Sequence, residues 1–458
     1  MTKQHTFDYD VIIIGSGAAG MSAALATSKA GKKTAIIEEG SLGGDSPNWS
    51  DIPINALQNA ANLYAEAKRG STFGLRSATM GYNYHSVRAW KDLAIKRTGA
   101  SGSRKYYENL GIDIFNGSAH FLSPNEISVN RRHLSAHYFV IATGARWVIP
   151  DDIPGMDATE YLTPNSITES ARPPKTLLVV GSSDTGIAIA QIMAAFGTKV
   201  YIAEKSARFL PTYDEDVSDA IKRTFSDMYG IISLNHSRVL SVVKEGLSKR
   251  AIISRAGSEK TIRVDEVLIA TGRKPNVDLG LENAGVKYTP TGIKVNENLQ
   301  TSVKHIWAAG AVLGRDSRTH SVLLEGQIVA HNILSRNKIK PDYTATPKVI
   351  FTLPNIATVG LSEDDCLKRD LAINKAFVPL SITARSNTTD FKDGFVKIVT
   401  DKKGVMLGAT IVAPNGAEMI HELGLAVKNE LTAHQIATTP HAFLSWSEAI
   451  RMAAGKLS

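Results

Sequence analysis

The chain has 458 residues, which exceeds the usual size of a single-core domain, so we expect two or three domains. Its apolar share of 43% and charged share of 21% are typical of a soluble globular protein, and no apolar run reaches the roughly 18 residues of a membrane span. The net charge of +8 includes short pairs such as Arg131-Arg132 rather than a Lys/Arg block, so we expect a solvated basic surface and no nucleic-acid partner.

The N-terminus and the cysteine content bear on the cellular location of the protein and on its capacity to form disulfides. Met1–Phe7 is polar and lacks the apolar core of a signal peptide, which predicts a cytoplasmic location. The chain has one cysteine, Cys366, so it cannot form an internal disulfide. Cys366 follows three acidic residues, and we interpret it as an incidental surface thiol. We predict no metal site.

The first dinucleotide-type unit lies near the N-terminus. Val11–Ile14 is an apolar run too short for a helix, and it ends at the first glycine of a G-x-G-x-x-G motif, as a buried parallel strand should. The three glycines permit a tight turn, a close approach of pyrophosphate and close packing of helix on strand. A second strand, Thr34–Ile37, ends in Glu38, which is placed to accept hydrogen bonds from ribose hydroxyls. Strand, glycines, helix, strand and acid in this order predict a dinucleotide site.

The chain then continues through helical segments to a second unit of the same kind. Gln58–Leu110 has mostly helical spacing, and the strand Tyr138–Ile141 ends in Ala-Thr-Gly, an ending that recurs at Gly272. Between these endings, the strand Leu177–Val180 is followed by a Gly-rich turn, the helix Ile187–Phe196 and the strand Lys199–Ala203.

The sequence of the second unit does not decide which nucleotide it binds. Ser183 replaces the middle glycine, where a side chain takes space near the pyrophosphate. Glu204 favours NAD(H) over NADP(H), whereas Lys205 and Arg208 could instead meet a 2′-phosphate. A vestigial unit that no longer binds nucleotide is the alternative.

The last third changes in character. Thr301–Gly314 is expected to be a strand leading into a turn, and the helix His320–Leu334 follows it. After Tyr343, strand-like runs are followed by the helical segments Ala417–Asn429 and Ser447–Ala454 without a βαβ rhythm, which predicts a separate α+β domain.

These features together resemble a known family. The chain is similar to class I pyridine nucleotide–disulfide oxidoreductases, which include dihydrolipoamide dehydrogenase, glutathione reductase and mercuric reductase. The similarity rests on the two nucleotide units, the two Ala-Thr-Gly endings, the Thr-x-x-x-x-Ile-Trp-Ala-x-Gly segment of 301–310, Leu324–Gly326 and Phe351–Pro354. The resemblance implies an α/β fold with two Rossmann-type dinucleotide-binding domains and a C-terminal α+β dimerisation domain. It implies an FAD-binding domain of residues 1–148 and 276–342, an NAD-binding domain of 149–275, a dimerisation domain of 343–458, and a homodimer.

The motif and the resemblance together imply the cofactor contacts. For FAD they are Gly15, Gly17, Ala18, Ala19, Gly20, Glu38, Gly44, Asp45, Thr143, Gly144, Gly310 and Ala311. For NAD(H), which we favour over NADP(H), they are Gly181, Ser183, Gly186, Glu204 and Gly272.

The chain departs from the family where the resemblance places the redox chemistry. In the frame Gly43–Pro53, the two cysteine positions hold Ser46 and Asp51, which cannot form a disulfide or a thiolate–flavin pair. A family Lys–Glu ion pair corresponds to Asn55 and Ala188, so both partners are absent.

Further departures concern the base and the flavin. The family's His-Pro corresponds to Phe443 and Leu444, while its neighbouring Glu is kept as Glu448. We interpret His441 as an interface histidine rather than a base. Ala311 replaces the Asp that bonds the FAD ribitol, at a cost of about 0.5–1.5 kcal/mol, so we still expect FAD to bind.

The resulting hypothesis is an FAD-dependent NAD(P)H oxidoreductase that passes electrons to a quinone, a dye, oxygen or an unknown acceptor. Asp51 could bond a flavin edge or an acceptor, but we expect it to cap the Ile52–Leu57 helix. One alternative is a catalytically degenerate protein that serves as a nucleotide-binding or regulatory partner. Another is a flavoenzyme that oxidises a small molecule in the vacated disulfide pocket.

Overall fold

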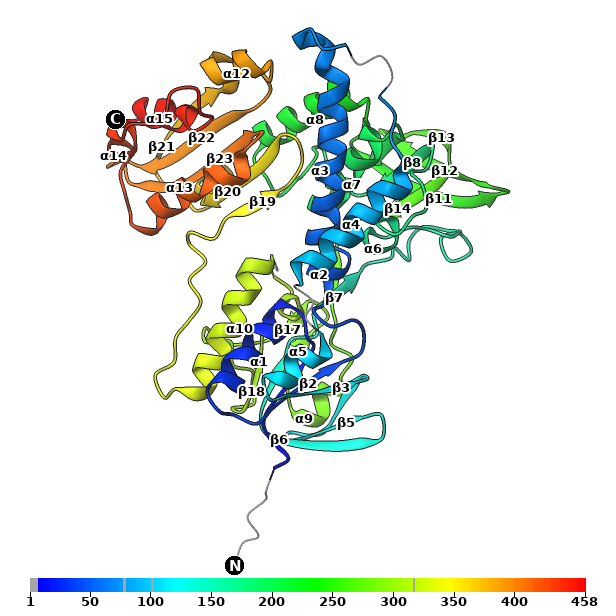
Figure 1. Ribbon diagram of the computed structural model, residues 1–458, viewed down its shortest axis with the longest axis vertical. Helices are drawn as coiled ribbons and strands as arrows, with labels where there is room; N and C mark the ends of the chain where they lie inside the picture. The colour runs from blue at the N-terminus through cyan, green and yellow to red at the C-terminus, as the bar shows by residue number, and fades with distance from the viewer. Residues whose placement is uncertain (1–6, 77–79, 100–102, 316–317) are drawn as a thin grey trace, which may run out of the picture. The chain divides into compact units, whose positions relative to one another are not determined.

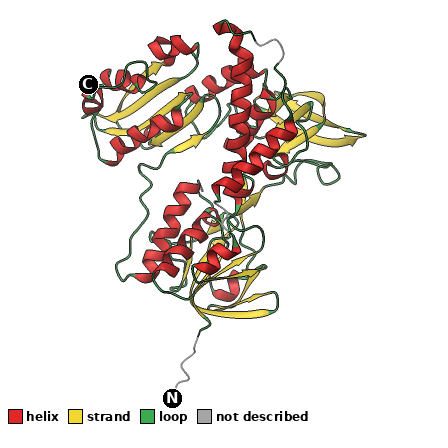
Figure 2. Cartoon of the chain, in the orientation of Figure 1, coloured by secondary structure: helices red, strands yellow, loops and turns green. Residues whose placement is uncertain are grey.

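The computed structural model describes residues 7–76, 80–99, 103–315 and 318–458 (Figures 1 and 2). Its contacts divide the chain into two compact units. Unit 1 comprises residues 1–53, 90–148 and 272–341, and unit 2 comprises 54–89, 149–271 and 342–458. This division is coarser than the three expected domains, whose borders remain a prediction.

Unit 1 is built on a sheet with the order β3-β2-β1-β6-β5-β4, and β18 also pairs with β6. The parallel strands are β1 (Tyr9–Ile14), β2 (Thr34–Glu38), β3 (Ile112–Asn116), β6 (Arg132–Ile141) and β18 (Ile306–Ala308). The antiparallel strands β4 (Ala119–Ser123) and β5 (Glu126–Val129) extend the sheet beyond β6. The expected strands Val11–Ile14 and Thr34–Ile37 are confirmed, and their apolar side chains are fully or almost fully buried.

Two helices of unit 1 lie side by side, α1 (Ala18–Lys29) and α10 (Thr319–Leu334) (Figure 1). A Cβ on Gly326 would lie 2.2 Å from the Ala19 carbonyl oxygen, so the glycine permits this close approach. The remaining elements assigned mainly to unit 1 are α2 (Asp45–Asn48), α5 (Arg104–Asn109), β7 (Ala145–Trp147), β15 (Arg273–Pro275), α9 (Leu281–Ala284), β16 (Tyr288–Thr289), β17 (Gly292–Ile293) and the 3₁₀ turn η2 (Ala311–Leu313). Two helices, α3 (Asp51–Lys68) and α4 (Tyr84–Thr98), have residues in both units, and η1 (Arg69–Phe73) lies in unit 2.

The first part of unit 2 contains the second nucleotide-type sheet, with the order β10-β9-β8-β14. These strands are β8 (Thr176–Val180), β9 (Lys199–Ala203), β10 (Ile232–Leu234) and β14 (Glu266–Ile269), all parallel. The helices are α6 (Pro164–Ile167), α7 (Asp184–Ala195) and α8 (Glu215–Tyr229), and an antiparallel sheet is formed by β11 (Ser237–Glu245), β12 (Ser248–Arg255) and β13 (Ser258–Val264). The expected strand–turn–helix–strand order is confirmed. The helix begins at Asp184, three residues earlier than expected, because Ser183 caps it.

The second part of unit 2 is the expected α+β segment. Its antiparallel sheet has the order β19 (Lys348–Ile350), β20 (Asn355–Gly360), β23 (Met406–Ala413), β22 (Phe395–Asp401) and β21 (Ile373–Pro379). The helices are α11 (Glu363–Lys368), α12 (Ala384–Thr389), α13 (Gly416–Lys428), α14 (Ala433–Thr438) and α15 (Glu448–Gly455), with a 3₁₀ turn η3 (Leu380–Ile382). A single hydrophobic core contains side chains from this sheet and from α13 and α15. Ile411 on β23, Ile420 on α13 and Ile450 on α15 belong to it.

The interpretation of Cys366 as a surface thiol is wrong. Its side chain is fully buried on α11, and burial raises the pKa of the thiol. The acidic residues before it lie in the first turn of α11, where Ser362 forms a capping box with Asp365, and the next residue faces the core. Within the described ranges, none of the helices has the length and apolar composition needed to cross a bilayer.

Candidate functional site

The first glycine loop connects β1 to α1, and each glycine of its motif has a different role. A Cβ on Gly15 (φ 100°) would lie 2.4 Å from the Ala142 carbonyl oxygen, and one on Gly20 would lie 1.9 Å from the Gly15 carbonyl oxygen. Gly17 has no heavy atom within 4 Å of its Cβ position and caps α1 without a side-chain hydrogen bond. The first turn of α1 therefore offers backbone N–H groups and open space to an anion.

The acid that the sequence predicts to contact a ribose in the first unit is held by the same loop. Glu38 Oε2 accepts from the Ser16 backbone N–H at 2.8 Å and from the Ser16 hydroxyl at 2.6 Å. Glu38 Oε1 accepts from the Gly40 N–H at 2.7 Å. These bonds fix the carboxylate at the end of β2 and leave lone pairs for further hydrogen bonds.

The other residues assigned to FAD gather at the same edge of the sheet. A Cβ on Gly44 (φ 67°) would lie 2.7 Å from Gly17 Cα, and one on Gly310 would lie 3.3 Å from Ala19 Cβ. Thr143 follows β6, and its hydroxyl donates to the Asn276 carbonyl oxygen at 2.8 Å. The remaining assigned residues adjoin these in sequence: Ala18, Asp45, Gly144 and Ala311. This edge carries the carboxyl ends of parallel strands, where open α/β sheets bind ligands.

Gly310 is further fixed by a buried acid that sequence reasoning did not assign. Its N–H donates to Glu325 Oε2 at 2.6 Å, and Arg315 Nη2 lies 3.0 Å from Glu325 Oε1. Glu325 belongs to the Leu-Glu-Gly motif that carried the resemblance, so the motif was a signal for this role.

The second loop repeats the hydrogen bonds of the first. Glu204 Oε2 accepts from the Ser182 N–H at 2.9 Å and the Ser182 hydroxyl at 2.5 Å, and Oε1 accepts from the Ser206 N–H at 2.8 Å. Burial opposes ionisation of Glu204, but these hydrogen bonds outweigh it and lower its pKa. Gly181 and Gly186 also keep their packing roles, since a Cβ would lie 2.7 Å and 2.6 Å from atoms of Ala270. Gly272 (φ 115°) follows β14.

Ser183 is the difference between the two loops. Its hydroxyl accepts from the Gly186 N–H at 3.2 Å and caps α7, whereas Gly17 makes no such bond in the first loop. The serine hydroxyl therefore occupies a backbone donor that a nucleotide pyrophosphate would otherwise use.

Replacing this serine should improve nucleotide binding. We expect Ser183→Gly to bind NADH several-fold more tightly, because it frees one backbone donor and removes a side chain. The free energy of unfolding should fall by only about a few tenths of a kcal/mol, since glycine is a tolerated N-cap residue. Fluorescence titration with NADH and thermal melting measure the two effects. Ser183→Ala is the control, with a stability loss of about 1 kcal/mol, and unchanged NADH affinity in both variants would contradict the prediction.

The two positions assigned to the redox cysteines form a hydrogen-bonded pair. The Ser46 hydroxyl on α2 donates to Asp51 Oδ2 at 2.8 Å, and the Thr319 hydroxyl at the start of α10 donates to the same oxygen. Ser50 donates to Asp51 Oδ1 at 3.3 Å. The expected cap role of Asp51 is wrong, because α3 already begins at Asp51 and the hydrogen bonds described for its carboxylate come from hydroxyls. The result is an exposed carboxylate surrounded by hydroxyl groups.

Asp45 carries a charge beside the first loop and is paired. Asp45 Oδ1 accepts from Trp49 Nε1 at 2.7 Å, and Oδ2 forms an ion pair with Arg273. The Arg273 guanidinium also lies 5.2 Å from the centroid of the Trp147 ring. Arg273 thus offsets a negative charge next to Gly44, a role that sequence reasoning did not assign to it.

Near the positions of the family's Lys–Glu pair, which the sequence predicts to be absent, the structure has neutral amides. Ala188 is buried on α7 and Asn55 is exposed on α3. One turn further along both helices, Gln58 Nε2 donates to Gln191 Oε1 at 3.2 Å, and both glutamines are buried. Gln191 also bonds the backbone of Leu353 at 2.7 and 2.8 Å. The helices are therefore joined without a buried charge.

The expected base position is exposed and apolar. Phe443 is 72% exposed, and Leu444 has a left-handed backbone (φ 65°). His441 is held within the chain, with Nδ1 2.8 Å from the Thr439 carbonyl oxygen and Nε2 2.8 Å from Glu422 Oε1. Among the described residues, Glu448 Oε2 is buried without a hydrogen-bond partner.

Comparison with known proteins assigns the chain to a family. Residues 9–330 match the family model described as pyridine nucleotide-disulphide oxidoreductase, and residues 346–454 match the dimerisation domain of the same family. The chain belongs to the pyridine nucleotide-disulphide oxidoreductase family.

Relatives within the oxidoreductase family match almost the whole chain. A mercuric reductase of Staphylococcus aureus is 33% identical over 98% of this chain and 82% of its own length. A dihydrolipoyl dehydrogenase of Geobacillus stearothermophilus is 31% identical over 94% of this chain and 93% of its own. Among solved structures, the Cu(II) complex of the HOCl-induced flavoprotein disulfide reductase RclA from Escherichia coli has a TM-score of 0.88 and 25% identity, covering 99% of this chain and 100% of that one.

Membership of the oxidoreductase family confirms the resemblance, the α/β fold class and the presence of a dimerisation domain. The family comprises FAD-dependent oxidoreductases that use NAD(P)H. The homologues found for this chain are disulfide reductases of this family.

Proposed function

We propose that this protein is an FAD-dependent NAD(P)H oxidoreductase that transfers electrons from a nicotinamide through the flavin to an acceptor other than a disulfide. The observation that carries the proposal is the Ser46–Asp51 hydrogen-bonded pair at the positions assigned to the redox cysteines. The chain has one cysteine, buried on α11, and a single cysteine cannot replace a redox pair. Acceptors that need no thiol, such as a quinone, a dye or oxygen, fit this arrangement.

The residues of unit 1 fit an FAD molecule. The open space at Gly17 and the free amides of α1 suit the pyrophosphate, and Glu38 suits a ribose. Bound flavin would supply the hydride acceptor for the reaction. The chain's own contribution near the former disulfide is the Asp51 carboxylate, kept in place by Ser46 and Thr319, which can accept a hydrogen bond from an incoming acceptor.

In unit 2, the repeated Ser182–Glu204 arrangement supports nucleotide binding, and the ionised acid at the ribose position favours NADH over NADPH. The dimerisation domain supports a homodimer, which sedimentation of the purified protein would test.

The visible absorption spectrum tests the proposed reaction. We expect the purified protein to show an oxidised flavin band that bleaches on anaerobic addition of NADH, because hydride transfer to flavin does not need the cysteine pair. No long-wavelength charge-transfer shoulder from a thiolate should appear, since Ser46 and Asp51 carry no sulfur. A protein that stays colourless after soaking in excess FAD would contradict the flavoenzyme proposal.

A second candidate is a catalytically degenerate nucleotide-binding or regulatory partner. The Ser183 hydroxyl on the Gly186 N–H favours it, because this bond competes with the nucleotide. In that case the flavin band would be present and would not bleach with NADH. Bleaching by NADH would exclude this candidate.

A further inference from the structure

The loop that follows Glu204 carries the two cations that a 2′-phosphate could meet, and both are paired with acids. Arg208 Nη2 lies 2.8 Å from Asp364 Oδ2, and the two side chains are about equally half-buried. Lys205 Nζ lies 3.5 Å from Asp152 Oδ2, which also accepts from Arg238 at 3.2 Å. The Arg208 pair is the closer and better shielded of the two, so it should persist at moderate salt.

The backbone around Arg208 is fixed on both sides. The Ser206 N–H donates to Glu204 Oε1 at 2.8 Å, and the Leu210 N–H donates to the Ser182 hydroxyl at 3.2 Å. Both anchors belong to the ribose acid and the glycine loop of the second nucleotide unit. The backbone of Arg208 therefore lies beside the part of the second unit that is predicted to hold the adenosine. Its guanidinium can bind a nucleotide only if an acidic side chain does not already occupy it.

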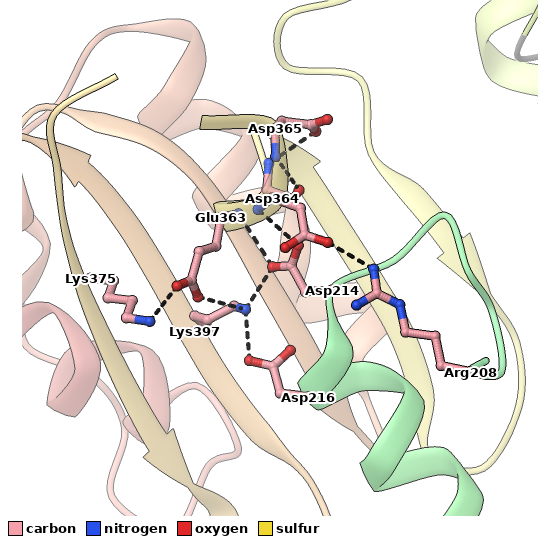
Figure 3. Close-up of polar contacts among 9 residues, drawn as sticks. Arg208, Asp214, Asp216, Glu363, Asp364, Asp365, Lys375 and Lys397 are labelled. Atoms are coloured by element: carbon pink, nitrogen blue, oxygen red, sulfur yellow. Dashed lines mark hydrogen bonds and ion pairs between the residues drawn. The ribbon is translucent and has the colours of Figure 1, made fainter. Parts of the chain in front are cut away.

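The position of Asp364 is set by a buried ionic cluster, shown in Figure 3. Lys397 on β22 lies 2.6 Å from both Asp214 Oδ2 and Asp216 Oδ2, and its side chain and that of Asp214 are 3% exposed. The two oxygens of Asp214 accept from the backbone N–H groups of Glu363 and Asp364 at 3.3 and 3.2 Å. The buried pair thus holds the first turn of α11, and this turn directs the Asp364 carboxylate onto Arg208 (Figure 3).

We propose that Asp364 is a specificity-determining residue that withholds the Arg208 guanidinium from the 2′ position of a bound nucleotide and so makes the second unit select NADH over NADPH. A 2′-phosphate needs a cation nearby, and arginine is suited to bind it through two hydrogen bonds. With Asp364 in place, that phosphate would have to displace a carboxylate and would lie close to Glu204 as well. The inference rests on the proposed nucleotide-binding role of unit 2.

The test is Asp364→Asn in the full-length protein, which removes the charge and keeps the size of the side chain. We expect the ratio of kcat/KM for NADPH to that for NADH to rise about tenfold, the effect of one additional charged hydrogen bond. Equilibrium binding of adenosine 2′,5′-bisphosphate, relative to 5′-AMP, should rise by a similar factor and does not depend on turnover. Asp365→Asn, in the same helix turn, is the matched control and should leave both ratios unchanged.

The double variant Arg208→Gln/Asp364→Asn separates the proposed role from a general structural one. It should lose the gain, because the freed cation is absent. An Asp364→Asn protein that weakens both nucleotides equally, or leaves both ratios unchanged, would overturn the specificity role and leave the proposed function intact. If wild type and variants bind neither adenosine probe and oxidise neither nucleotide, the proposed function fails together with the inference.

Discussion

Replacing Lys397 by methionine should destabilise the protein by about 3–5 kcal/mol, the usual cost of leaving a buried charge without its partner. Lys397 is almost fully buried between Asp214 and Asp216, so water cannot compensate for its loss. Urea unfolding at pH 7, followed by circular dichroism, measures the change. Lys375→Met is the control, since Lys375 pairs with Glu363 while 56% exposed and should contribute less than about 1 kcal/mol.

A second substitution shows whether the unpaired acid is the cause. Lys397→Met combined with Asp214→Asn should recover part of the loss, because asparagine carries no charge and its one amide oxygen can still accept one of the two backbone N–H groups of α11. If the double variant is as unstable as the sum of the two single variants, the loss comes from packing rather than from charge.

The same pair determines the response to acid. Burial opposes ionisation of Asp214, but the hydrogen bond and charge of Lys397 outweigh it and lower the pKa of Asp214 below its ordinary 3.8. A lowered pKa stabilises the fold above the unfolded value and loses this effect as the pH falls through the folded value. The difference in unfolding free energy between wild type and Lys397→Met should therefore be large at neutral pH and shrink on acidification, as the carboxylates left without Lys397 become protonated.

The second large effect concerns the first glycine loop. Gly17→Ala should leave the stability of the FAD-free protein nearly unchanged, because its Cβ meets no atom within 4 Å and its φ is −60°. We expect FAD affinity to fall at least tenfold, since the new methyl group stands where the pyrophosphate must approach the amides of α1. FAD titration of the deflavinated protein, followed by flavin fluorescence, measures this affinity.

Gly20→Ala is the contrasting variant. Its Cβ would lie 1.9 Å from the Gly15 carbonyl oxygen, so α1 cannot keep its packing against β1 and the FAD-free protein itself should lose stability. Thermal melting of the two FAD-free proteins separates the cases. Equal melting temperatures would contradict the distinct roles that we assign to the two glycines.

Local patterns predicted most of the fold. Patterns of neighbouring residues predict the short apolar strands, the glycine turns, and the acids at the ends of β2 and β9. Both nucleotide units could therefore be located from the sequence. The helix ends were less certain, because caps decide them. Ser183 moved the start of α7, and Asp51 proved to be the first residue of α3 rather than a cap before it.

The contacts that the sequence did not predict join residues far apart in the chain. The sequence offered Arg208 as a candidate for a 2′-phosphate, but its partner Asp364 is 156 residues away and no local pattern connects them. Asp45 and Arg273 are likewise 228 residues apart. Cys366 was misplaced because a six-residue helix is too short for its buried face to be read from its periodicity.

Unit 1 is made of three separate chain segments, so its folding during synthesis must wait for the last of them to leave the ribosome. The Ser22 hydroxyl of α1 donates to the Leu323 carbonyl oxygen of α10 at 2.9 Å, across 301 residues. At a synthesis rate of about 5–20 residues per second, α1 waits roughly 15–60 s for this partner. The residues between them, including the segment 149–271 of unit 2, emerge during that interval. The glycine loop of the nascent chain therefore gains its Gly310 and α10 neighbours late, so we expect the predicted flavin site to be complete only after α10 has emerged.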